Sequence, residues 1–112
     1  MKKVKTSELS GQALDWAVAK AEGYPDEDIS VDWNYSTDWR LGGSLIEREG
    51  IQIQKHRSGW VALPEDAQFS EEEYQEGSTI LIAAMRCYVA SKLGEEVDMA
   101  SNIEAHEIGD FK

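Results

Sequence analysis

The stretch TILIAAMRCYVASKL, Thr79–Leu93, decides the fold. Its apolar residues form three stripes that together occupy almost every side of a helix. Ser78 or Thr79 can cap the amino end of such a helix, and Gly94 can close its carboxyl end. A helix that is apolar nearly all round is covered on several sides. We therefore expect this segment to be the central helix of the core.

A β-hairpin is predicted earlier in the chain, separated from this helix by an acidic loop over about residues 65–76. The run IQIQKH, from Ile51 to His56, alternates apolar and polar residues, which is typical of a half-buried strand. The residues RSG can turn the chain, WVAL can return as a second strand, and Pro64 ends it. The hairpin is therefore expected over about residues 51–63.

A second long helix is predicted near the amino terminus. Val4 and its lysine neighbours can form a short edge strand, and Ser7 or Ser10 can then cap a helix that runs to about Ala21. Gly23 and Pro25, which follow, favour its termination. Trp16 points away from the main apolar face of this helix, so either a loop covers the indole or it serves a surface.

The segment between the first helix and the hairpin has weaker periodicity. A short strand is expected around 29–33, followed by an ordered loop with several aromatic residues. For residues 45–49 two readings stay open: a helical turn that starts at the capping box Ser44–Glu47, or a strand paired through Gly50. After the hairpin, Ser70–Glu73 is another possible capping box of a short helix.

These elements predict an α+β domain in which two main helices pack on a small antiparallel sheet, with a long ordered aromatic loop. A length of 112 residues suits one domain. We expect residues 1–97 to form it and residues 98–112 to be a mobile tail.

Composition limits the classes of partner. A net charge of −11 makes direct binding to a nucleic-acid backbone unfavourable, because such binding depends on Lys and Arg. Basic or neutral partners fit, and an acidic protein that imitates DNA is an alternative. The single cysteine, Cys87, fits a reducing compartment. The chain has no apolar run long enough for a signal peptide or a membrane span, so a cytoplasmic protein is expected.

The familiar chemical motifs are not matched. Acidic residues from Asp26 to Asp32 have the spacing of a calcium loop, but Val31 and Thr37 occupy the positions that need Gly and Glu. His56, His106 and Cys87 lie far apart in the sequence and form no local ligand pair. The glycine-rich loops that bind phosphate are not found. We expect no catalytic residue, no metal site and no cofactor.

One surface has the composition of a binding site. The loop from Trp33 to Arg40 combines aromatic rings, hydroxyl groups and charges, which is typical of recognition surfaces. The same loop could instead pack on the core. Together with nearby charged residues and one arginine of the central helix, the candidate binding residues are Trp33, Tyr35, Ser36, Thr37, Asp38, Trp39, Arg40, Glu47, Arg48, Glu49 and Arg86.

Arg86 lies among apolar positions of the central helix. A guanidinium that is buried there requires a partner, and Asp38, Glu47 or Glu49 could form an ion pair with it. The alternative is that Arg86 binds an anionic small ligand, such as a nucleotide, in a pocket under the loop.

Three segments, VKTSELSGQALDWAVAKAEG, YSTDWRLGGSLIEREGI and LIAAMRCYVASKLGEEV, resemble the NinX-like family of small phage and prophage proteins. The resemblance spans residues 1–97. It implies a phage accessory protein made in a bacterial host, and it brings no established activity, cofactor or catalytic residue. We therefore expect a non-enzymatic module that binds a host or phage macromolecule, most of all a protein. A small-ligand binder is the first alternative, and an acidic DNA mimic is the second.

Overall fold

The computed structural model describes residues 2–30, 32–68 and 74–99. Within these ranges the helices are η1 (Thr6–Glu8), α1 (Gly11–Ala21), η2 (Asp26–Asp28), α2 (Trp39–Glu49) and α3 (Ile80–Leu93). The strands are β1 (Lys2–Lys5), β2 (Gln52–His56), β3 (Gly59–Leu63), β4 (Gln75–Gly77) and β5 (Glu96–Met99).

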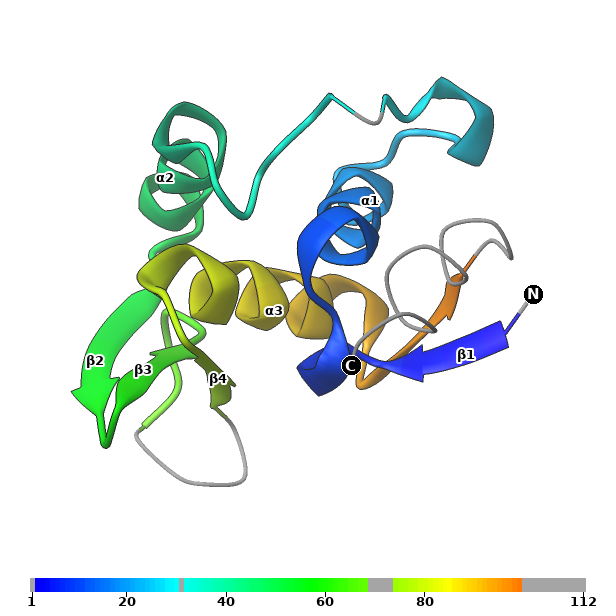
Figure 1. Cartoon of the computed structure of the whole chain (residues 1–112). Helices are drawn as coiled ribbons and strands as arrows, with labels where there is room; N and C mark the ends of the chain where they lie inside the picture. Colours follow the sequence, from blue (N-terminus) through cyan, green and yellow to red (C-terminus); the bar gives the residue numbers. More distant parts are fainter. Residues whose placement is uncertain (1, 31, 69–73, 100–112) are drawn as a thin grey trace.

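Helix α3 runs through the centre of the molecule, as its sequence predicts (Figure 1). Helices α1 and α2 lie on one side of it, and the two small sheets lie towards the other side. The side chains of Ala83, Met85 and Val89 are fully buried. Contact with helices and strands on several sides explains why α3 carries apolar residues almost all round.

Both sheets are antiparallel. One has the strand order β2-β3-β4, and the other pairs β1 with β5. The predicted hairpin is confirmed, with Gln52 opposite Leu63 and His56 opposite Gly59. Val4 pairs with Val97, so the expected strand at the amino terminus is also confirmed. Chain segments from the two ends of the domain therefore meet in one sheet.

The α+β class is confirmed, but the segment between α1 and the hairpin differs from the prediction. The strand expected around 29–33 is wrong: η2 ends at Asp28, and the described residues that follow form turns and irregular backbone. Residues 45–49 are helical, and they form the last part of the eleven-residue helix α2. The expected capping box at Ser70–Glu73 lies outside the described residues.

Buried apolar residues of α1 and α3 form a hydrophobic core cluster. Trp16 is only 6% exposed, so the indole is covered rather than displayed, and Lys20 Nζ lies 4.9 Å from its ring centre. Cys87 is buried, and burial raises the pKa of its thiol to about 12. Strand β5 continues to Met99, whose side chain is fully buried. The remainder of the expected tail, residues 100–112, is not described.

Candidate functional site

Asp38 begins α2. Its Oδ1 atom accepts a hydrogen bond from the backbone N–H of Arg40 at 2.9 Å, which satisfies one of the unpaired donors at the helix start. The Arg40 guanidinium also donates to Asp38 Oδ2 at 3.0 Å, and these hydrogen bonds lower the pKa of the carboxyl group. The N-cap of the helix therefore lies six residues before Ser44, the N-cap of the capping box that the sequence suggested. Ser44 lies inside it and donates to the carbonyl oxygens of Arg40 and Leu41.

The glycine pair lies inside α2 and has a packing role. A Cβ atom on Gly42 would lie 2.4 Å from the carbonyl oxygen of Tyr35 and 2.7 Å from a methyl group of Leu81. A Cβ atom on Gly43 would lie 3.1 Å from the ring of Trp39. Gly42 thus allows α2 to approach α3 and the preceding loop, and Gly43 leaves room for the Trp39 indole one turn earlier on the helix.

The Trp39 side chain is 56% exposed. It forms one wall of an open hollow of about 400 Å³ between the start of α2, β3 and the start of α3. Trp60 of β3 lines the same hollow. We call this feature the Trp39 hollow; its lining residues are Ser36, Thr37, Trp39, Trp60, Ser78, Thr79, Ile80 and Leu81.

The loop before α2 is tied to the core. The backbone N–H of Ser36 donates to Oδ1 of the buried Asp15 on α1 at 2.7 Å. Tyr35 is only 8% exposed, and burial raises the pKa of its hydroxyl group. Trp33 packs against Tyr24, with ring centres 4.8 Å apart. The aromatic side chains of this segment therefore serve both the core, where Tyr35 is buried, and the surface, where Trp39 is exposed.

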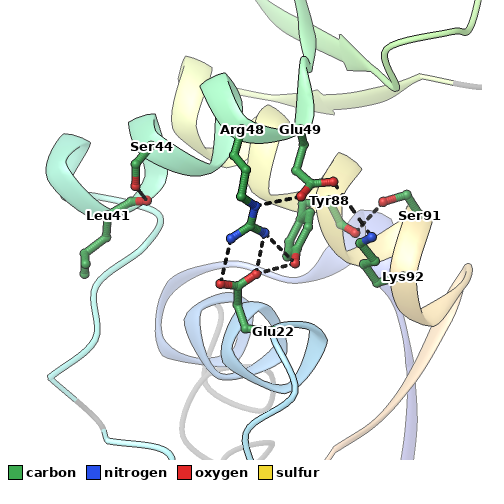
Figure 2. A network of polar contacts seen from close by, with 8 residues as sticks. All are labelled: Glu22, Leu41, Ser44, Arg48, Glu49, Tyr88, Ser91 and Lys92. Carbon is green, nitrogen blue, oxygen red and sulfur yellow. Dashed lines mark hydrogen bonds and ion pairs between the residues drawn. The ribbon is translucent and has the colours of Figure 1, made fainter.

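A cluster of polar side chains, distinct from the Trp39 hollow, joins the ends of three helices (Figure 2). Arg48 of α2 donates to both carboxylate oxygens of Glu22, which follows α1, at 3.2 and 2.7 Å. Arg48 also donates to Glu49 Oε2 at 2.8 Å. Tyr88 of α3 donates its hydroxyl hydrogen to Glu22. Lys92 completes the cluster, with Nζ 3.8 Å from Glu49 Oε1.

The electrostatics of this cluster follow from its geometry. Hydrogen bonds from Arg48 lower the pKa of Glu22, although partial burial opposes them. Burial and the hydrogen bond to Glu22 raise the pKa of Tyr88. The carboxylate therefore stays ionised, the phenol stays neutral, and the cluster fastens α1 and α2 to α3 rather than offering a reactive group.

The ion pair predicted for Arg86 is wrong. Its Nε donates to the carbonyl oxygen of Leu9 at 2.7 Å, and Nη1 donates to that of Glu76 at 2.6 Å. Main-chain oxygens, which accept hydrogen bonds without carrying a charge, take the place of the expected carboxylates. Arg86 does not line the Trp39 hollow.

The structure therefore divides the predicted binding residues among several places. Ser36, Thr37 and Trp39 line one hollow. Tyr35 is buried, Arg48 and Glu49 hold helices together, and Glu47 is exposed on α2. Trp60, Ser78 and Thr79 join the hollow from other elements, and the sequence does not reveal their proximity because it depends on how β3 and α3 pack.

The described residues were also searched for metal-binding clusters and for membrane-spanning helices. No group of three or more His, Cys, Asp or Glu side chains among them is arranged to hold a metal ion. None of the described helices is both long enough and apolar enough to cross a membrane.

A comparison with known protein families finds a match over a large part of the chain. A family model described as "Bacteriophage P22, NinX" matches residues 24–92. This range contains α2, the hairpin and most of α3, and it includes every residue that lines the Trp39 hollow. A search of curated proteins found no match.

Proposed function

The chain belongs to the family of bacteriophage P22 NinX and is thus a phage accessory protein, and from this premise we propose that it acts by binding another protein. The partner is a protein of the host or of the phage, and it meets the chain in the bacterial cytoplasm. Binding recruits or occludes the partner, and the chain catalyses no reaction.

One observation carries this proposal: a large aromatic side chain stands exposed beside a hollow with apolar walls. Trp39 is 56% exposed, and the hollow beside it is lined by apolar atoms of Trp60, Ile80 and Leu81. Tryptophan is among the residues that contribute most to protein interfaces, because it removes a large apolar area from water at a small cost in entropy. An apolar side chain of the partner would enter the hollow and cover the indole.

The surface is also held in shape before any partner arrives. Asp38 fixes the start of α2, Gly43 provides the space in which the indole lies, and Asp15 holds the loop at Ser36. A rigid surface loses little conformational entropy on binding. These three constraints support binding by a preformed surface.

The rim of the hollow indicates what else the partner provides. Hydroxyl groups of Thr37, Ser78 and Thr79 surround the apolar walls and can form hydrogen bonds with a peptide backbone. The net charge of −11 favours a basic or neutral partner over an acidic one.

The test compares affinity purification from infected host cells for the tagged wild-type chain and the Trp39→Ala variant. Tyr24→Ala is the matched control, because Tyr24 is the other large aromatic residue that is exposed among the described residues, and it does not line the hollow. We expect one partner to be enriched by the wild type and by Tyr24→Ala, and to be reduced at least tenfold with Trp39→Ala.

Two results would overturn the proposal. One is that no protein is enriched by the wild-type chain over the tag alone. The other is that Trp39→Ala, folded to the same extent by circular dichroism, enriches the same partner as well as the wild type does.

A further inference from the structure

A second surface carries two arginine side chains although the chain as a whole is acidic, and it adjoins the Trp39 hollow through Trp60 and Ser78. Two adjoining hollows of about 510 and 330 Å³ share Arg57, Glu76 and Arg86 among their lining residues. We call their common part the Arg57–Arg86 groove. It lies where the tip of the β2–β3 hairpin, strand β4 and helix α3 meet.

Arg86 provides a fixed positive charge in this groove. Its Nε and Nη1 atoms donate to the carbonyl oxygens of Leu9 and Glu76, which hold the guanidinium in place without neutralising it. Burial lowers the pKa of Arg86, and the charge of Glu76 opposes this effect. An arginine stays protonated in proteins, so a half-buried guanidinium that donates to two neutral carbonyl oxygens can still attract an anion.

Arg57 provides the second charge from the tip of the hairpin. Its backbone has φ 56°, a left-handed conformation that glycine or asparagine adopts more easily than arginine. No ion pair or side-chain hydrogen bond joins its guanidinium to another residue in the described ranges. An arginine at a position that suits glycine better is consistent with a role for its side chain.

The other lining groups can donate hydrogen bonds. Ser7 lines the larger hollow, and Ser58 and Ser78 line the smaller one. Among the described residues, Glu76 is the acidic one that lines both hollows; its side chain is exposed, so it can turn towards solvent. Two guanidinium groups and several hydroxyl groups form a set of donors that suits a phosphate group.

We propose that Arg57 and Arg86 form a binding site for a small oxyanion, either inorganic phosphate or the phosphate group of a monoester. The oxyanion lies between the two guanidinium groups and accepts hydrogen bonds from the serine hydroxyl groups at the rim. This site does not depend on the binding of a protein at Trp39.

The experiment is an NMR titration of the 15N-labelled full chain, at constant ionic strength, with inorganic phosphate and separately with adenosine monophosphate. Sodium chloride is the reference ion. We expect both phosphate compounds to shift the amide signals of residues 56–59 and 75–78 in a saturable manner, and chloride to leave them in place. Adenosine monophosphate distinguishes the sources: tighter binding than phosphate assigns the site to a monoester, and equal binding assigns it to phosphate itself.

Arg57→Gly is the decisive variant. Glycine accepts φ 56° without strain, so the variant keeps its fold while it loses one guanidinium. We expect its affinity for both compounds to fall at least tenfold. Lys3→Gln is the matched control, because it removes one positive charge from β1, away from the groove, and its affinity is expected to equal that of the wild type.

The proposal is overturned by any of three results. The first is that neither phosphate compound produces saturable shifts. The second is that Arg57→Gly binds as tightly as the wild type. The third is that Lys3→Gln weakens binding as much as Arg57→Gly does, which would reduce the effect to net charge.

Discussion

Glu22 connects the ends of three helices through hydrogen bonds. Its carboxylate accepts hydrogen bonds from Arg48 of α2 and Tyr88 of α3, and it directly follows α1 (Figure 2). The sequence gives no sign of this role, because Glu22 is one of 22 acidic residues and its two partners are 26 and 66 positions away. Contacts over such distances in the chain exist only after the helices have packed.

Glu22 makes stability depend on pH in a defined direction. Its folded pKa lies below the ordinary value of 4.5, so its contribution is complete above that pH and is lost as the pH falls through the folded value. We expect Glu22→Gln to lower the free energy of unfolding at pH 7 by about 1 kcal/mol, because Arg48 is half exposed and water screens the pair.

Urea denaturation at a series of pH values measures this effect. The difference between wild type and Glu22→Gln is expected to shrink as the pH falls below 4.5, while Glu27→Gln, on the exposed helix η2, provides the control. A difference that grew on acidification would contradict the role given to the carboxylate.

The two neighbouring glycines of α2 are expected to respond differently to substitution. Gly42→Ala places a methyl group 2.4 Å from a backbone oxygen, which costs about 1–3 kcal/mol of overpacking and outweighs a gain of about 1 kcal/mol in helix propensity. Gly43→Ala meets only the Trp39 ring at 3.1 Å, which can move. Equilibrium unfolding should therefore show Gly42→Ala to be the less stable variant.

Tryptophan fluorescence adds a control to this comparison. Gly43→Ala is expected to change the emission of Trp39 at unchanged or slightly higher stability, because the methyl group displaces the ring. Equal stability of the two alanine variants would show that the close approach of α2 at Gly42 is not needed for the fold.

At the scale of elements, α2 is the part that sequence patterns predicted least well. The glycine pair and the aromatic residues before it favour a loop, and Ser44 with Glu47 imitates a helix start. In the structure the helix starts at Trp39, because Asp38 caps it there. Gly42 lies inside the helix, where the absence of a side chain allows close packing. Propensity disfavours glycine within a helix, but here the tertiary contact decides.

The hairpin and α3 were predictable for the opposite reason. Alternation in β2 and apolar stripes in α3 are local properties of consecutive residues, and each matches one type of element. The Trp39 hollow was predictable only in part. Ser36, Thr37 and Trp39 come from one continuous segment, but Trp60 and the start of α3 come from elsewhere in the chain.

The loop between α1 and α2 is expected to depend on Asp15. Asp15→Ala removes the buried acceptor of the Ser36 N–H and leaves that donor without its partner, which should lower the free energy of unfolding by about 2 kcal/mol. Asp15→Asn keeps an oxygen at the same place and should lose less. Hydrogen exchange of the Ser36 amide measures the effect locally.

The amide of Ser36 is expected to exchange faster in Asp15→Ala than in the wild type, by a larger factor than amides of β1. If the Ser36 amide stayed as protected as in the wild type, Asp15 would not be the group that holds the loop.

At the scale of the whole molecule, a small acidic α+β fold presents two neighbouring surfaces, which meet at Trp60 and Ser78. Strands β1 and β5 close the domain at one end, and α2 with the β2–β3–β4 sheet lies at the other (Figure 1). The exposed Trp39 and the Arg57–Arg86 groove both belong to the second end. Class and family could be predicted from the sequence, but the placement of these surfaces depends on packing.

Site-specific photo-crosslinking in infected cells tests the central claim, that a protein partner binds at the Trp39 hollow, most directly. A benzophenone amino acid would replace the exposed Thr37 at the hollow or, as the control, the exposed Glu96 on β5. We expect a discrete covalent adduct of one partner from position 37 and none from position 96. An adduct from position 96 alone, or none from position 37, would contradict it.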